Sequence, residues 1–282
     1  MSQRRLLLCT DMDRTIIPNG TQSEHSDARK RFKAFCQHSD VALAYVTGRH
    51  KSSAQQAIKT YLLPEPDFVI TDVGSKIHQV KEGQWSELLD LQQDIIKSWK
   101  GKSHAEIKAY LINIPGLLLQ ESHNQNTHKL SFYLPLYANT KIVMQTIEAR
   151  LKEHDIEASV IWSIDELKKI GLVDVLPSNA NKLHAIQLLQ KKLNYKHHEI
   201  IFAGDSGNDM PVLVSNLKSI LVDNASDEVK ETALQQCLQK SHESSLYIAQ
   251  AERYGMNANY SAGVLEGIGH YAPLFDVLIK ES

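Results

Sequence analysis

The strongest constraint on this chain is a short apolar run, Leu6 to Cys9, that is followed by two carboxylates two residues apart, Asp11 and Asp13. The brevity and apolar continuity of the run predict a buried strand of a parallel sheet. Open α/β sheets hold their ligands at the carboxyl ends of their strands, so we expect both acids to lie in a cleft. Two close carboxylates repel each other unless a divalent cation or a shared proton neutralises them; the alternative interpretation is a strand followed by an Asp-containing turn.

A second segment repeats this pattern. The apolar residues 200–203 lead into the sequence GDSGND, residues 204–209. Its two glycines permit a tight turn in which Asp205 and Asp209 point back toward one site. Because hard carboxylate oxygens are the ligands that Mg²⁺ prefers, the segment predicts a magnesium site.

Composition and charge exclude several classes of protein. The 282 residues carry a formal net charge of -2, which offers no basic field for nucleic acid or for an anionic membrane. The three cysteines form no CxxC pair, so we expect reduced thiols. No apolar stretch reaches membrane-spanning length, and the run before Asp11 is too short for a signal peptide. We expect a cytoplasmic monomer.

The order of predicted elements indicates an α/β protein interrupted by an insert. Strands alternate with amphipathic helices at both ends of the chain, which is typical of a parallel sheet built from βαβ units. The predicted elements are helices at 28–36, 52–61 and 182–193 and strands at 41–46, 67–71, 171–176, 199–203 and 219–222. Between them, alternating strands at 129–134 and 158–162 and helices at 87–100 and 140–154 predict a small α+β unit. We therefore expect a core domain of residues 1–75 and 171–282 and a cap domain of residues 76–170.

Lys182 stands in the first turn of the predicted helix at 182–193. A cation there is unfavourable for the helix dipole, and a phosphate shared with the free backbone amides would compensate it. The alternative is a solvated lysine. The four acids could supply a nucleophile and a metal site, Lys182 a fixed positive charge, and the pair Thr47 and Gly48 hydrogen-bond donors to phosphate. This combination is typical of enzymes that catalyse phosphoryl transfer.

Four motifs in this order, DMDRT, VTGR, the pair Asn181-Lys182 and GDSGND, resemble those of phosphatases of the haloacid dehalogenase superfamily. The segments at 66–75, 174–177, 222–225 and 262–268 are similar to those of sucrose-phosphate phosphatases. The resemblance implies a Rossmann-like core sheet with a large inserted cap.

By this resemblance, Asp11 attacks phosphorus and becomes an aspartyl-phosphate, while Asp13 protonates the leaving oxygen and then activates water. Mg²⁺ is expected on Asp11, the backbone carbonyl of Asp13 and Asp205. Asp209 either completes the metal shell or orients Lys182, which stabilises the transition state.

The resemblance also implies a substrate-binding set. Thr47 and Gly48 would bind phosphate, and we place Asn208 in the same set. Arg49 would reach phosphate or a sugar hydroxyl, unless it is a surface ion-pair partner. Lys129 resembles a cap residue that closes over the sugar; the alternative is an exposed strand lysine. Arg14 departs from the family pattern, which often has a small or amide residue there.

The predicted function is Mg²⁺-dependent hydrolysis of a sugar phosphate, with sucrose 6-phosphate as the first candidate. Trehalose, mannosylglycerate or hexose phosphates are alternative substrates, phosphotransfer between sugars is an alternative reaction, and a non-catalytic sugar-phosphate-binding partner of a glycosyltransferase is an alternative class. A sugar-phosphate synthase is the candidate protein partner. Because the cap is expected to open and close, the segments around Gly74 and Gly171 are candidate hinges.

Overall fold

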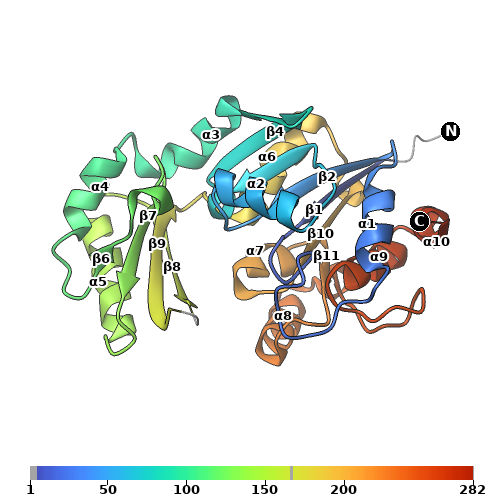
Figure 1. Ribbon diagram of the computed structural model, residues 1–282. Helices are drawn as coiled ribbons and strands as arrows, with labels where there is room; N and C mark the ends of the chain where they lie inside the picture. Colours follow the sequence, from blue (N-terminus) through green and yellow to red (C-terminus); the bar gives the residue numbers. More distant parts are fainter. Residues whose placement is uncertain (1–4, 166–167, 282) are drawn as a thin grey trace.

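The computed structural model describes residues 5–165 and 168–281, which form two sheets with their own helices (Figure 1). The larger sheet has eight strands in the order β12-β11-β10-β1-β2-β3-β4-β5. Their bounds are β1 (Leu6–Thr10), β2 (Val41–Val46), β3 (Phe68–Thr71), β4 (Lys76–Lys81), β5 (Gln84–Glu87), β10 (Ile200–Gly204), β11 (Lys218–Leu221) and β12 (Leu246–Ile248). The strands from β12 to β3 are parallel, whereas β4 and β5 are antiparallel additions.

The direction of the chain reverses at β1. From β1 it proceeds to β2 and β3 on one side, and it later returns to β10, β11 and β12 on the other. In open α/β sheets such a switch point leaves a crevice at the carboxyl ends of the two central strands. The crevice here lies at the ends of β1 and β10, directly before Asp11 and Asp205.

Helices cover both faces of the large sheet. Successive residues of β1 alternate between the two faces, so that Leu6 and Leu8 belong to one hydrophobic core and Leu7 and Cys9 to the other. The first core is covered by α1 (Ala28–Cys36), α2 (Lys51–Thr60), α9 (Tyr260–Tyr271) and α10 (Asp276–Glu281). The second is covered by α3 (Leu89–Ile96), α6 (Lys182–Leu193), α7 (Met210–Leu213) and α8 (Asp227–Lys240).

The smaller sheet is antiparallel and has its own core. Its strands run in the order β6 (Leu118–Leu119), β7 (Leu130–Leu134), β9 (Ile170–Pro177) and β8 (Ala158–Asp165). Helices α4 (His104–Leu111) and α5 (Thr140–Glu153) pack on it. Trp99, Phe132, Ile147 and Val173 are among the residues buried in this third core, which we call the cap core.

Most predicted elements are confirmed. The helices expected at 28–36 and 182–193 and the strand at 41–46 have the expected bounds, and the others shift by one or two residues, apart from the helix expected at 87–100 and the strand expected at 158–162. The α helix α3 covers only Leu89–Ile96, and a 3₁₀ turn follows it at Lys97–Trp99. The strand β8 extends to Asp165. The α/β class with a large parallel sheet is also confirmed.

The sheet pairing differs from the expected domain boundaries at both ends. Residues 76–87, assigned to the cap, form β4 and β5 of the large sheet. The strand at 171–176, assigned to the core, lies in the small sheet as part of β9. Gly171 is therefore an interior strand residue that pairs with Leu134 and Ile164, and the hinge expected there was wrong.

The chain passes between the second core of the large sheet and the cap core at two places. At the first place, Ile95 belongs to the second core and Trp99 to the cap core. At the second place, Val175 belongs to the cap core and Leu176 to the second core. The backbone of Glu157 ties the two places together, because its amide donates to the Ser98 carbonyl at 3.1 Å and its carbonyl accepts from the Ser178 amide at 3.1 Å. Within the described ranges, no helix has the length and apolar character needed to cross a bilayer.

His78 on β4 generates a prediction about stability and pH. Burial lowers the pKa of His78 to about 4 from an ordinary 6.5. The folded chain therefore binds this proton only at a pH well below that at which the unfolded chain binds it. The associated stability is present above pH 6.5 and is lost as the pH falls toward 4. We expect the free-energy advantage of the wild type over His78→Gln to shrink by roughly 2–3 kcal/mol across this window. Urea denaturation at several pH values measures it; a pH-independent difference would contradict the assignment.

Candidate active site

Asp11 and Asp205 lie side by side because they follow neighbouring parallel strands. The Asp11 backbone amide donates to the Ala203 carbonyl at 2.8 Å, which extends the pairing of β1 and β10 past the end of β1. Both side chains are buried. The structure therefore brings these two strand-end acids together.

Lys182 lies between two carboxylates. Its Nζ is 3.0 Å from Asp11 Oδ1 and 2.6 Å from Asp209 Oδ1, and its side chain is completely buried. Helix α6 places it there, with Asn181 as the N-cap accepting a hydrogen bond from the His184 amide. The alternative of a solvated lysine is wrong, because the side chain is buried. The two acids offset the unfavourable position of this cation at the start of a helix.

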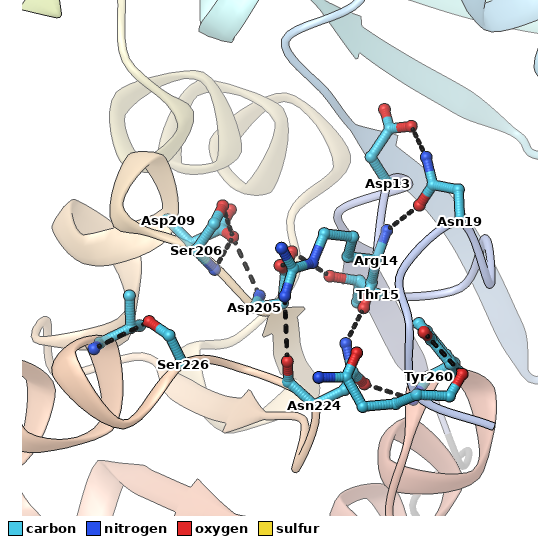
Figure 2. A network of polar contacts seen from close by, with 12 residues as sticks. Asp13, Arg14, Thr15, Asn19, Asp205, Ser206, Asp209, Asn224, Ser226 and Tyr260 are labelled. Carbon is cyan, nitrogen blue, oxygen red and sulfur yellow. Dashed lines mark hydrogen bonds and ion pairs between the residues drawn. The ribbon is translucent and has the colours of Figure 1, made fainter. Parts of the chain in front are cut away.

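Asp209 is held by the turn that precedes it. Its Oδ2 accepts hydrogen bonds from the backbone amides of Asp205 and Ser206, both at 3.1 Å, and from the Ser206 hydroxyl at 3.2 Å (Figure 2). A Cβ on Gly204 would lie 2.6 Å from the Asp209 carboxyl carbon, so this close approach requires glycine. With Oδ1 on Lys182 and Oδ2 on the turn, Asp209 fixes the lysine in place.

The electrostatics of the cluster are dominated by burial and crowding. Burial and the neighbouring carboxylates raise the pKa of Asp11 well above its usual value, although Lys182 opposes this. Burial and Asp209 raise the pKa of Asp205 to about 7. Burial disfavours the charge on Lys182, yet Asp11 and Asp209 outweigh it and raise its pKa.

These residues fit a divalent cation. Asp11, Asp205 and Asp209 each place a carboxylate oxygen within 4.8 Å of the others. Three buried carboxylates face one buried ammonium, which leaves an excess of negative charge among oxygen donors of the kind that Mg²⁺ takes. Burial is the largest cause of the raised pKa values of Asp11 and Asp205, and the neighbouring carboxylates add to both shifts.

The Asp13 side chain lies outside this cluster. Arg49 binds it with two hydrogen bonds, from Nε at 2.7 Å and from Nη2 at 2.6 Å. Asn19 also donates to it at 2.8 Å (Figure 2). Among the described residues, the group of side chains able to hold a metal does not include Asp13. Arg49 is thus an ion-pair partner in this structure, although a half-buried one next to the site rather than a residue of the open surface.

A polar network that the sequence did not predict supports the first motif. Thr15 donates to Asp205 Oδ1 at 3.1 Å, and the Arg14 Nε lies 3.5 Å from Asp205 Oδ2. Arg14 has a left-handed backbone with φ 58°, and Asn224 holds it by donating to the Arg14 carbonyl at 2.6 Å (Figure 2). Thr15 and Asn224 belong to segments that carried the family resemblance. That resemblance was the sequence signal that could have pointed to these two residues.

The phosphate-binding candidates surround the cluster. Asp11, Asp13, Gly48, Arg49, Asp205 and Asn208 are among the residues that line a hollow of about 320 Å³. Thr47 is buried beside it, and its hydroxyl accepts from the Arg49 amide at 3.1 Å. Asn208 is exposed at the rim, where the Ser206 hydroxyl donates to its side-chain oxygen at 3.3 Å.

Lys129 lines an adjoining hollow of about 290 Å³ between core and cap. Gly48 and Arg49 line both hollows, so the two are neighbours. The Lys129 Nζ lies 3.8 Å from Asp72 Oδ1 and 3.9 Å from Asp174 Oδ2. Because Lys129 is only 8% exposed, the interpretation as an exposed strand lysine was wrong. Neither acid was singled out from the sequence.

The fold and the acid cluster define a phosphatase of the haloacid dehalogenase type. The chain belongs to the sucrose-6F-phosphate phosphohydrolase family, whose sequence model matches residues 4–272. It resembles the sucrose-phosphatase of Synechocystis, solved with sucrose and phosphate, with a TM-score of 0.75 and 26% identity over 95% of this chain and 98% of that one.

Three relatives are similar to this chain over most of its length. A protein from Nitrosococcus oceani, whose name places it among HAD-like hydrolases without a substrate, is 44% identical over 96% of this chain and 73% of its own length. A mannosylfructose-phosphate phosphatase from Agrobacterium fabrum is 27% identical over 94% of this chain and 96% of its own. The chain spans about 60% of the length of sucrose-phosphatase 2 from Nicotiana tabacum.

The buried lysine generates a prediction about stability. Lys182→Met leaves Asp11 and Asp209 without their buried counterion, so we expect the free energy of unfolding to fall by about 3–5 kcal/mol. Mg²⁺ in the buffer should restore part of this loss. The matched control is Lys192→Met on the same helix, which breaks only the exposed pair with Asp90 and should cost less than about 1 kcal/mol. Equal losses in urea denaturation would refute the role assigned to the cluster.

Proposed function

We propose that the chain hydrolyses a sugar phosphate, with sucrose 6-phosphate as the first candidate, through an aspartyl-phosphate on Asp11. The observation that carries this proposal is the meeting of Asp11, Lys182 and Asp205 from three distant parts of the chain, with the two acids at the wall of one hollow and the lysine buried behind Asp11. A carboxylate can approach an anionic phosphate only where positive charge is concentrated, and Lys182 supplies that charge at 3.0 Å from Asp11.

In the first step, an Asp11 oxygen forms a bond to phosphorus while the bond from phosphorus to the sugar oxygen breaks. Asp13 gives a proton to the departing oxygen, which leaves as the sugar hydroxyl. Thr47, the Gly48 amide and Asn208 hold the phosphate oxygens, and Lys182 neutralises charge on the phosphoryl group. Arg49 binds Asp13 in this structure, so its guanidinium must release that carboxyl before the proton is transferred.

In the second step, water attacks the phosphorus of the aspartyl-phosphate and the Asp11 carboxylate leaves. Asp13, now ionised, accepts the proton of that water, so inorganic phosphate and the starting carboxylate are formed. One residue thus serves as acid and then base. Contact with Arg49 between the two steps would stabilise the ionised form of Asp13 that serves as the base.

Mg²⁺, held by Asp11 and Asp205 with the Asp13 backbone carbonyl, would supply Lewis-acid stabilisation of the negative charge on the transferring phosphoryl group. Asp209 serves chiefly to orient Lys182, because both its oxygens already have partners. Thr15 orients Asp205 from the side by its hydrogen bond to Oδ1.

The choice of sugar is supported by the family and by the solved relative that binds sucrose and phosphate. Because one relative is named a mannosylfructose-phosphate phosphatase, another disaccharide phosphate is an alternative substrate to sucrose 6-phosphate. The trehalose, mannosylglycerate and hexose phosphates remain in the set to be tested. The domain division, the synthase partner, the monomeric state and the cytoplasmic location stay predictions.

The proposal predicts activity on a panel of sugar phosphates. With Mg²⁺, we expect phosphate release from sucrose 6-phosphate at a kcat/KM at least about tenfold above that for trehalose 6-phosphate or glucose 6-phosphate. Asp11→Asn should abolish release from every substrate, and chelation of the metal should do so reversibly. Activity that survives in Asp11→Asn would refute the covalent route, whereas equal activity on all sugars would refute only the choice of sucrose.

The role of Asp13 predicts a dependence on the leaving group. A sugar alkoxide needs a proton to leave, whereas p-nitrophenolate does not. Asp13→Asn should therefore lower the rate with the sugar phosphate by about 10²–10⁴. With p-nitrophenyl phosphate it should still give a burst of about one nitrophenolate per chain, followed by slow turnover because the base for water is missing. Stopped-flow absorbance measures the burst; its absence with equal losses on both substrates would contradict the dual role.

A further inference from the structure

A strained turn joins β3 to β4 in the large sheet. Asp72, Val73 and Gly74 have φ values of 51°, 59° and 102°. This left-handed backbone is unfavourable for a residue with a side chain, most of all for a β-branched valine. Conformations of this kind persist only where the surrounding contacts enforce them, and they gather at functional sites.

The contacts that enforce this turn come from the catalytic part of the core. The Asp72 amide donates to the Arg49 carbonyl at 2.9 Å, and the Val73 amide donates to the Thr47 carbonyl at 3.1 Å. A Cβ on Gly74 would lie 2.4 Å from the Asn181 carbonyl oxygen, directly before Lys182. The turn is therefore fixed to the phosphate-binding loop on one side and to the start of α6 on the other.

The Asp72 side chain points from this turn toward the cap. It is only 3% exposed, and its Oδ1 lies 3.8 Å from Nζ of Lys129, which comes directly before β7. The Thr71 hydroxyl donates to Oδ2 at 3.3 Å and limits the rotation of the carboxylate. Burial raises the pKa of Asp72, and Lys129 is the largest influence that opposes the rise.

A second acid completes the surroundings of Lys129 from within the cap. Asp174 on β9 lies 3.9 Å from Nζ, and the Ser131 hydroxyl donates to its Oδ1 at 2.5 Å. A long lysine side chain would otherwise sample many rotamers, and ordering it only when substrate arrives would weaken binding. Two carboxylates, the buried Asp72 from the large sheet and the partly buried Asp174 from the cap, restrict it in advance.

We propose that Asp72 is a positioning residue that holds Lys129 over the hollow next to the phosphate-binding loop, so that the sugar of the substrate meets a cation already in place. This inference rests on the proposed function for the identity of the ligand, but the placement of Lys129 can be tested without it. Asp72 acts through Lys129 and does not touch the reacting atoms.

The kinetic test uses Asp72→Asn, because asparagine tolerates the left-handed backbone and keeps the side-chain shape. We expect KM for the preferred sugar phosphate to rise about 5- to 20-fold, with kcat changed at most about threefold, since an ordered contact is lost and the chemistry is kept. With p-nitrophenyl phosphate, which has no sugar, KM should rise much less. A fall in kcat with KM unchanged, or equal KM effects on both substrates, would overturn the proposal.

Two further variants separate positioning from general damage. Asp155→Asn breaks the ion pair of Asp155 with Lys100 inside the cap and should leave both substrates unaffected. Lys129→Met should raise KM for the sugar phosphate at least as far as Asp72→Asn does. If Asp72 works through Lys129, the double variant should be no worse than Lys129→Met alone; additive effects would overturn the proposal.

A readout without turnover keeps the inference separate from the proposed function. Lys129 is nearly buried, so acetic anhydride should acetylate it slowly in the wild type, as followed by peptide mass spectrometry. In Asp72→Asn we expect its acetylation rate to rise about 3- to 10-fold, because a freed lysine is exposed more often. The rate at the exposed Lys168 is the internal control. An unchanged rate at Lys129 would overturn the positioning role even if the sugar phosphatase activity is confirmed, and a rise would support it even if another substrate is found.

Discussion

The buried ammonium of Lys182 is the interaction on which the rest of this structure depends. It joins Asp11 at the end of β1 to Asp209 in the turn after β10, and it comes from the first residue of α6. A buried charge of this kind is tolerated only when its partners are close and held in place. The packing of α6 on the sheet and the geometry of the 204–209 turn therefore have to agree to within hydrogen-bonding distance.

The distribution of charge around Lys182 separates the tasks of the site. Inside, the three acids of the cluster outnumber the one lysine, which suits a cation-assisted attack on phosphate. Outside, the Asp13 side chain has a guanidinium and an amide as hydrogen-bond partners. Two carboxylates two residues apart can thus serve as nucleophile and as acid and base. The strained turn at Asp72 extends this order to the cap, where Lys129 is held.

Much of the fold was predictable because it follows from local periodicity. The α6 helix shows apolar residues at helical spacing, and β1 is a continuous apolar run, so the type of both could be predicted, with the bounds of α6 and with β1 to within one residue. Which sheet a strand joins was not predictable in the same way. Strands β4 and β9 carry ordinary strand patterns, and their pairing depends on which backbone edge is free after the chain has folded. The domain boundaries that we expected after residues 75 and 170 therefore do not coincide with the places where the chain leaves one sheet and joins the other.

The sequence by itself determined the chemistry of this protein: which acids follow strands, which lysine begins a helix, and that these belong together as a phosphoryl-transfer set. Each of these features is encoded by a few neighbouring residues. Only the tertiary structure decided that Arg49 binds Asp13, that Asp209 contacts Lys182, and that Asp72 faces Lys129 across the two parts of the molecule. These are contacts between side chains far apart in sequence, whose distances are set by the packing of sheets and helices and leave no local pattern to recognise.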